Sequence, residues 1–257
     1  MKRLQISSSL LVALLFASPA SADSALDAIR MRGVLRVGTT GDYKPFSFRN
    51  SDGSYVGADI VMAQHLAHEL NVKLEFVPTT WSALLPDFAA RKYDVAMGGV
   101  SVLPERAAQG DFSNIVAIDG KRPIARCADK ERFTSVEAID QSDVRVVFNP
   151  GASNESFART HFSHAHLIVQ TDNTAIFDEI VEGRADVMVT DGIEVDHQVY
   201  IHPQLCPADV TAPFTKVEKA YLLPKDAALV KFVNDWLATE MSSGDWPRIL
   251  DAALHQK

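Results

Sequence analysis

Short runs of β-branched and aromatic residues alternate along the chain with longer stretches in which apolar residues recur at helical spacing. Residues 34–38 are typical of a strand, whereas residues 58–70 repeat apolar side chains every third or fourth position, as an amphipathic helix does. Two aromatic runs, 46–48 and 55–56, flank a turn and predict a hairpin. Further strands are predicted at 74–77, 144–148, 167–169 and 187–190, and further helices at 81–90, 153–161 and 174–182.

This alternation of strands and helices predicts an α/β fold with parallel sheets whose faces are covered by helices. The segments 91–97 and 183–189 share one pattern. In each of them a basic residue is followed by an Asp and then by the apolar residues of a predicted strand. The repetition predicts two lobes, with a ligand held between them at the carboxyl ends of the strands.

The N-terminal residues have the composition of an export signal. Lys2 and Arg3 precede an apolar run at 10–16, and a small-residue cleavage site ends at Ala22. No later run reaches the roughly 20 apolar residues that a transmembrane helix needs. We therefore expect a periplasmic protein that begins at Asp23 after cleavage and has no further membrane contact.

The formal net charge is −8, and the sequence has no tract rich in Lys or Arg. This balance argues against nucleic acid and anionic membrane surfaces as partners. It does not argue against a small anionic ligand, because the local charge of a pocket can oppose the global one. In an exported protein, the two cysteines Cys127 and Cys206 predict one disulfide, with two buried thiols as the alternative.

The segment 98–106 combines several groups suited to binding an anion. Gly98 and Gly99 follow a predicted buried strand and allow a ligand to approach the backbone closely. Ser101 adds a hydroxyl, and Arg106 adds a planar donor fork that matches a carboxylate. The alternative is a Pro-Glu-Arg helix start whose arginine is a solvated surface charge.

Several segments together resemble the polar amino-acid periplasmic binding proteins. They are 38–46, 57–59, Trp81, 101–106 and 183–186 together with Asp191. The resemblance covers nearly the whole mature chain and implies a two-lobed periplasmic-binding-protein fold with ligand in the interlobe cleft. The first lobe would comprise 23–121 plus 224–257, and the second would be the inserted segment 122–223.

Other segments resemble a catalytic branch of that fold, the periplasmic cyclohexadienyl (prephenate/arogenate) dehydratases. The matching stretches are 39–46, 149–155, 190–194 and 218–224, together with Cys127 and 202–206. The resemblance implies conversion of prephenate to phenylpyruvate, and of arogenate to phenylalanine, with loss of carbon dioxide and water. At 152–153 the chain has Ala-Ser where Gly-Thr is expected, and Ser153 keeps the hydroxyl.

This reaction needs an acid that protonates the departing hydroxide, and it requires neither a metal nor an organic cofactor. A carboxyl group desolvated among apolar neighbours can stay protonated near neutral pH and act as that acid. The resemblance assigns the role to Glu194, just past the predicted strand 187–190. The alternative for Glu194 is an ordinary first-turn glutamate favoured by the helix dipole.

Two substrate carboxylates require two sets of donors. Arg106 and Ser101, with the Gly99 backbone, would hold one of them. Gly151, Ser153 and Asn154 open a predicted helix, whose N–H groups and dipole favour the other. Further charge would come from Lys219 and Lys44, which are otherwise surface lysines, and Tyr43 and Trp81 would sandwich the ring.

Asp191 keeps a second function open. In amino-acid binders of this family the matching aspartate holds the ligand's ammonium, so a non-catalytic binding protein that delivers a polar amino acid to a transporter is the alternative. Arogenate also carries an ammonium, and an N-cap role for Asp191 is equally compatible with the sequence. The histidines 161, 164 and 166 lack the spacing of a metal site and are interpreted as solvated surface residues.

Overall fold

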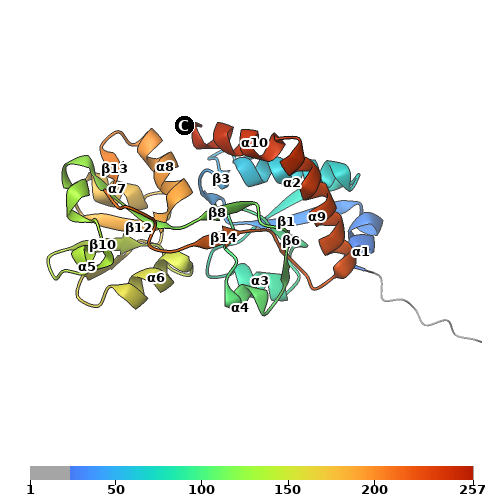
Figure 1. Cartoon of the computed structure of the whole chain (residues 1–257). Coiled ribbons are helices and arrows are strands. Elements are labelled where there is room, and N and C mark those ends of the chain that lie inside the picture. Colours follow the sequence, from blue (N-terminus) through green and yellow to red (C-terminus); the bar gives the residue numbers. More distant parts are fainter. Residues whose placement is uncertain (1–23, 257) are drawn as a thin grey trace, which may run out of the picture.

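The computed structural model describes residues 24–256, which form two α/β lobes side by side (Figure 1). The sheet of the first lobe has the order β5 (Lys73–Pro78), β1 (Val34–Thr39), β6 (Val95–Ala96), β15 (Leu222–Leu223) and β7 (Asp111–Phe112). β1 is parallel to β5 and β6, whereas β15 is antiparallel to both of its neighbours. A smaller sheet contains β2 (Asp42–Tyr43), β3 (Ser47–Arg49) and β4 (Tyr55–Val56).

The helices of the first lobe come from both ends of the described chain. They are α1 (Ala25–Arg32), α2 (Ala58–Glu69), α3 (Leu84–Ala89), α4 (Pro104–Ala107), α9 (Ala227–Ser242) and α10 (Asp245–Leu254). Leu35 and Val37 of β1 are fully buried and belong to one apolar cluster with residues of α2 and α9. The C-terminal helices are therefore part of the first lobe's core.

The second lobe has its own five-stranded sheet and its own apolar clusters. The order is β11 (His166–Val169), β10 (Arg145–Phe148), β12 (Val187–Asp191), β9 (Lys121–Arg126) and β13 (Leu205–Pro207). β10 is parallel to β11 and β12, whereas β9 is antiparallel to β12 and β13. The helical segments are η1 (Cys127–Arg132), α5 (Val136–Ile139), α6 (Ser153–His161), α7 (Ile176–Val181) and α8 (Gly192–Ile201).

Two antiparallel strands, β8 (Ala117–Asp119) and β14 (Val217–Lys219), run between the lobes (Figure 1). The expected lobe boundaries are 121/122 and 223/224. In the structure, Lys121 pairs within the sheet of the second lobe, and Leu222 pairs within the sheet of the first lobe. The second lobe is thus inserted between two crossings of one chain.

The local patterns located most elements. The predicted helix 153–161 coincides with α6, the strand 34–38 corresponds to β1, and the hairpin 46–48 with 55–56 corresponds to β3 and β4. The predicted helix 81–90 is wrong at its start, because α3 begins at Leu84. Ala83 N–H donates to the Thr80 carbonyl at 3.1 Å and closes a turn before the helix. The sheets are mixed rather than parallel, since β9, β13, β7 and β15 run antiparallel to their partners.

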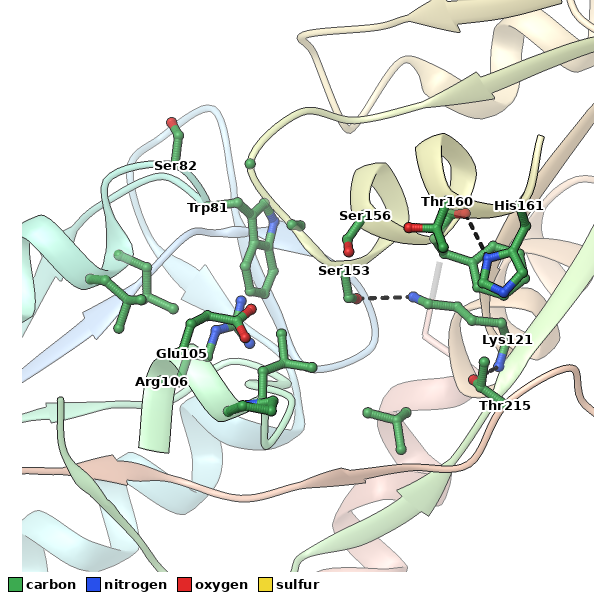
Figure 2. A pocket seen from close by; sticks show the side chains of 18 of the residues that line it. Trp81, Ser82, Glu105, Arg106, Lys121, Ser153, Ser156, Thr160, His161 and Thr215 are labelled. Atoms are coloured by element: carbon green, nitrogen blue, oxygen red, sulfur yellow. Dashed lines mark hydrogen bonds between the residues drawn. The ribbon is translucent and has the colours of Figure 1, made fainter. Parts of the chain in front are cut away.

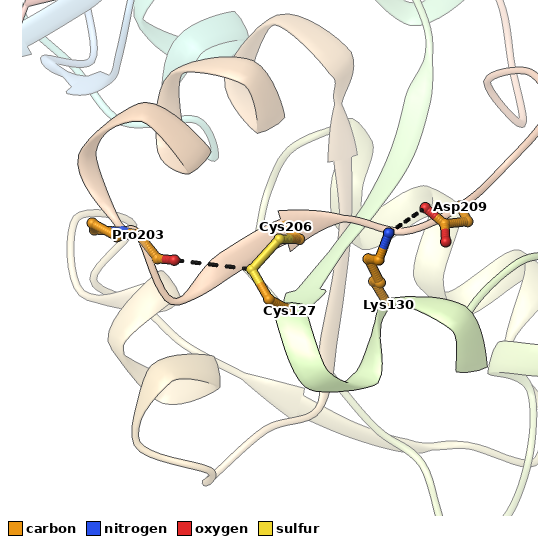
Figure 3. The surroundings of a disulfide bond; sticks show 5 residues. All are labelled: Cys127, Lys130, Pro203, Cys206 and Asp209. Carbon is orange, nitrogen blue, oxygen red and sulfur yellow. Dashed lines mark hydrogen bonds and ion pairs between the residues drawn. A yellow bond between two sulfur atoms is a disulfide. The ribbon is translucent and has the colours of Figure 1, made fainter.

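The disulfide predicted between Cys127 and Cys206 is confirmed (Figure 3). It joins the start of η1 to β13, so both cysteines belong to the second lobe. Cys127 Sγ also lies 3.9 Å from the Pro203 carbonyl, which is a contact only, because a disulfide sulfur has no proton to donate. A Lys130–Asp209 ion pair of 3.2 Å lies beside the bridge.

The predicted export signal and its cleavage site after Ala22 lie outside the described residues. Between residues 24 and 256, none of the helices is long and apolar enough to cross a membrane.

Candidate active site between the lobes

Two adjoining cavities lie between the lobes. The larger has a volume of about 650 Å³, and Figure 2 shows Trp81 and Arg106 on one side of it and Ser153 of α6 on the other. The smaller, of about 20 Å³, is lined from the first lobe by Tyr43 and Gly99, among others, and from the second by residues that include Asp191. Trp81, Arg106, Ala152 and Ser153 line both cavities.

The segment 98–106 forms the first-lobe wall. Gly99 has a φ of 73°, and a Cβ there would lie 2.4 Å from the Tyr43 ring, so glycine is required for this close approach. Asp59 holds the turn by accepting from the N–H groups of Gly98 (2.9 Å) and Gly99 (2.6 Å). Burial raises the pKa of Asp59 to about 6.

Arg106 is not a surface arginine, since only 5% of it is exposed. One of its guanidinium nitrogens donates to the Ser101 carbonyl at 3.0 Å, and the guanidinium lies 5.8 Å from the centre of the Trp81 ring. Arg106 lines both cavities, where a guanidinium can bind a carboxylate.

The two aromatic residues expected to enclose the substrate ring lie next to each other. Tyr43 and Trp81 meet edge to face, with ring centroids 5.5 Å apart and planes at 84°. Tyr43 stacks instead on Phe46, and Trp81 Nε1 donates to Asp42 at 3.1 Å. Both residues line the smaller cavity.

The start of α6 provides part of the second-lobe wall. Ser153 and Asn154 are the first two residues of this helix, and their N–H groups have no carbonyl partner within it. Gly151 differs from the prediction, because its N–H already donates to Glu155 Oε2 at 2.7 Å. The Asn154 amide donates to Thr190 Oγ1 at 3.1 Å, and thereby joins α6 to β12.

Asp191 lies at the centre of a buried ionic cluster. Lys121 Nζ donates to its Oδ1 at 2.8 Å, and Lys219 Nζ donates to its Oδ2 at 2.7 Å. Tyr43, from the other lobe, donates its hydroxyl proton to the same Oδ2 at 2.5 Å. Burial alone would raise the pKa of Asp191, but the two lysines outweigh burial and hold that pKa well below its usual range.

The N-cap role for the Asp191 side chain is wrong. Asp191 occupies the N-cap position of α8, but its side chain makes no capping hydrogen bond. The side chain of Asp119 in β8 accepts a hydrogen bond from the N–H of Ile193 at 3.1 Å, in the first turn of α8. The Asp191 carboxylate is therefore committed to the lysines and to Tyr43.

Glu194 lies one helical turn further along α8 and is 2% exposed. Thr190 donates a short hydrogen bond to its Oε2. Burial, followed by the nearby charge of Asp191, raises the pKa of Glu194 to about 8, against the lowering effect of the Thr190 hydrogen bond. Glu194 thus holds a proton at neutral pH. Neither Glu194 nor Lys219 is among the residues that line the two cavities.

Lys121 was missed by the sequence analysis. Its Nζ contacts Ser153 Oγ at 3.0 Å, Asn154 Oδ1 and Asp191, all of which follow it by more than 30 residues in sequence. The register of β9 against β12 places Lys121 directly opposite Asp191. The sequence feature that could have indicated Lys121 is a basic residue at the first position of the strand that enters the second lobe.

Other candidates make no contact with this cluster, although His161 lines the larger cavity. Lys44 places its ammonium 4.5 Å from the Phe48 ring centre and contributes no contact to the site. The three histidines are exposed; His161 stacks on Phe157, and His164 pairs with Asp140 at 2.8 Å.

The two-lobed fold with a charged interlobe site defines a class of solute-binding protein. Residues 35–256 match the bacterial extracellular solute-binding proteins, family 3, and the chain belongs to that family. The chain is 48% identical to a cyclohexadienyl dehydratase from Pseudomonas aeruginosa, over 89% of this chain and 85% of the relative. A histidine-binding periplasmic protein from Escherichia coli is 26% identical, over 97% of this chain and 95% of the relative.

Solved structures of ancestral proteins are similar as well. The ancestral amino acid-binding protein AncCDT-1, a precursor of cyclohexadienyl dehydratase, has a TM-score of 0.83 and 35% identity, covering 90% of this chain and 100% of its own. A variant of the ancestral cyclohexadienyl dehydratase AncCDT-3 has a TM-score of 0.58 and 48% identity, covering 91% and 98%.

Proposed function

We propose that the protein is a cyclohexadienyl dehydratase, a carbon–oxygen lyase that converts prephenate to phenylpyruvate and arogenate to phenylalanine. The 48% identity to the Pseudomonas aeruginosa dehydratase over most of both chains carries this proposal. A buried carboxyl group beside the cleft, Glu194, supports it, because its raised pKa of about 8 keeps the acid protonated at neutral pH.

The reaction is a decarboxylation coupled to loss of hydroxide. The bond between the ring and its carboxylate breaks, and that electron pair becomes part of the aromatic ring. The C–O bond at the opposite ring carbon breaks with its electron pair, and the departing oxygen takes the Glu194 proton to leave as water. Glu194 then regains a proton from solvent, and no oxidant or reductant is needed.

The remaining residues bind and orient the substrate. Arg106 and Ser101, beside the Gly99 turn, hold one carboxylate, and the first N–H groups of α6 at Ser153 and Asn154 hold the other. The helix N-terminus favours an anion through its oriented dipoles. Tyr43 and Trp81 contact the ring. Asp191, in the wall of the smaller cavity, and Lys219, behind that wall, fix the charge of the cleft.

We also propose that the chain is exported to the periplasm and cleaved after Ala22. The family consists of extracellular binding proteins, and an oxidising compartment suits the Cys127–Cys206 bridge. No nucleic acid, membrane surface or cofactor is part of the proposed activity.

A direct assay tests the function. The mature protein is incubated with prephenate or arogenate, and formation of phenylpyruvate or phenylalanine is followed. Turnover of prephenate is expected. The binding-protein alternative expects no turnover of either compound, together with thermal stabilisation by an amino acid of about 2.7 kcal/mol at one hundred times its dissociation constant.

A further inference from the structure

We propose that Asn173 is a further substrate-binding residue, which accepts a hydrogen bond from the ring hydroxyl that the substrate loses in the reaction. This inference rests on the proposed function. It assigns the leaving group a position in the site and names the residue that orients it. It applies to prephenate and arogenate alike, because both carry this hydroxyl.

Asn173 lies in the loop between β11 and α7 and belongs to the second-lobe side of the cleft. It is 6% exposed and lines the smaller cavity. Asp172 fixes the loop, since its carboxylate accepts from the Thr174 N–H at 2.9 Å and from the Thr174 hydroxyl at 2.6 Å. The backbone on both sides of Asn173 is therefore held in place.

The two ends of the Asn173 amide differ in their partners. Nδ2 donates to the Asp42 carbonyl of the first lobe at 2.9 Å, and because a carbonyl can only accept, this contact fixes which end of the amide is the oxygen. Oδ1 is buried and accepts no hydrogen bond from residues 24–256. A buried acceptor without a donor is costly, so such an atom on a residue that lines a cavity indicates a donor on the ligand.

The other side-chain oxygens of this lining are already in use. They belong to Tyr43, Ser101, Asn149, Ser153, Asn154 and Asp191, and each residue makes a hydrogen bond to a neighbouring side chain. Among the described residues that line the smaller cavity, Asn173 therefore has the one side-chain oxygen that is buried without a partner.

The substrates offer few hydrogen-bond donors. At neutral pH the two carboxylates and the keto oxygen of prephenate only accept, so its ring hydroxyl is its single donor. Arogenate has the same hydroxyl and adds an ammonium. The ring hydroxyl is therefore the donor that both substrates can present to Asn173 Oδ1.

The sizes of the two cavities agree with this assignment. The smaller, of about 20 Å³, has room for one group of the size of a hydroxyl, whereas the substrate ring needs the adjoining cavity of about 650 Å³. The hydroxyl and the ring carboxylate lie on opposite ring carbons. A hydroxyl in the smaller cavity therefore directs the carboxylate end toward Arg106 and Ser153, which line both cavities.

The proposed acid lies behind the same cavity. Asn154 lines it and donates to Thr190, which in turn donates to Glu194. The departing oxygen would receive the Glu194 proton while donating its own hydrogen to Asn173. Protonation makes that hydrogen a stronger donor, so the bond to Asn173 strengthens as the C–O bond breaks. Asn173 should therefore contribute to kcat as well as to substrate binding.

The first test measures kcat and KM for both substrates in the wild type and in Asn173→Leu, which keeps the approximate size of the side chain but removes both polar ends. The variant should lose at least about tenfold in kcat/KM for prephenate and for arogenate alike, because the hydroxyl is then buried without an acceptor. Thr171→Val is the control. Thr171 is an exposed residue of the same loop and lines neither cavity, so its variant should keep wild-type kinetics.

A second test separates recognition of the hydroxyl from the bond between the lobes, which Asn173→Leu also removes. Para-hydroxyphenylpyruvate and phenylpyruvate differ by a hydroxyl at the ring position that carries it in prephenate, and each is titrated by calorimetry. The wild type should bind the hydroxylated compound at least about fivefold more tightly, and Asn173→Leu should abolish this preference. Loss of the interlobe bond alone would weaken both compounds equally. The wild-type comparison decides the inference if Asn173→Leu fails to fold.

Three results overturn the inference while leaving the proposed function intact. They are equal affinity of the wild type for the two compounds, a preference that persists in Asn173→Leu, and unchanged kcat/KM in that variant. Absence of turnover of both substrates by the wild type instead refutes the proposed function, and the binding comparison then decides recognition of the hydroxyl by itself.

Discussion

Two carboxyl groups at the junction of β12 and α8 are equally buried but differ in protonation. Asp191 is 4% exposed and Glu194 is 2% exposed. Two ammonium groups within 2.8 Å hold the pKa of Asp191 well below its usual range. Glu194 has a hydroxyl neighbour instead, and burial raises its pKa to about 8. The number of cations in contact, rather than burial, separates the two groups.

This difference gives Asp191 a permanent negative charge and leaves Glu194 with a proton that it can transfer. Paired carboxyl groups whose pKa values are driven apart mark the acid in many enzyme sites. Here the ionised Asp191 anchors two lysines, and the protonated Glu194 is the group that can give up a proton. Replacing the acid by its amide should therefore affect turnover at Glu194 and stability at Asp191.

Glu194→Gln should produce the largest effect. The amide preserves size and the neutral state but supplies no proton, so kcat should fall by at least about 10²-fold with little change in KM or stability. Steady-state kinetics and thermal unfolding measure both. Asp196→Asn, on the same helix but with an exposed carboxylate, is the control and should retain turnover. Near-normal turnover in Glu194→Gln would assign the acid to another residue.

Asp191→Asn should mainly reduce stability. Without this carboxylate, Lys121 and Lys219 are buried without a counter-ion, which costs about 3–5 kcal/mol. Denaturant unfolding measures the loss, again against Asp196→Asn. A loss below about 1 kcal/mol, the range of exposed ion pairs, would show that the lysines do not depend on Asp191.

The pH profile of kcat should show which carboxyl group titrates. In the proposed mechanism the protonated form of Glu194 is the active one. Because the pKa of Glu194 is raised to about 8, kcat should be level below that pH. It should fall about tenfold for each further pH unit. The residual rate of Glu194→Gln should lack this descending limb. A limb near pH 4 in the wild type would instead indicate an acid with an ordinary pKa.

Thr190→Val should give the smallest change. The Thr190 hydroxyl stabilises the charged form of Glu194, so its removal should raise the pKa of Glu194 further and move the descending limb to higher pH. A single hydrogen bond corresponds to a displacement of about one pH unit or less. A shift to lower pH would contradict the assigned direction of this contact.

Local periodicity was sufficient to locate many elements. The helix 153–161 and the strand 34–38 follow from it directly, since apolar spacing depends only on neighbouring residues. The antiparallel strands were not predictable in this way. β9 and β15 enter their sheets from the crossings, and their direction depends on where the chain returns from the other lobe.

In the candidate site, too, contacts between residues distant in sequence could not be predicted. Ser101 and Arg106 were recognisable because both lie in one short segment. Lys121 was not, because its buried partners come from α6 and β12, and a lysine at a strand start has the same local pattern at the surface. The edge-to-face geometry of Tyr43 and Trp81 depends on how two separate loops pack.

The hydrogen bond between Tyr43 and Asp191 also has a kinetic consequence. It joins the two lobes, as does the 2.9 Å bond from Asn173 to the Asp42 carbonyl. A product enclosed by both lobes can depart only when they separate, and both bonds must then break once in each catalytic cycle. The residence time of the product is therefore coupled to a domain motion, of a kind that takes microseconds to milliseconds in many enzymes. Tyr43, which we propose contacts the substrate ring, would then also delay release of the product through its bond to the other lobe.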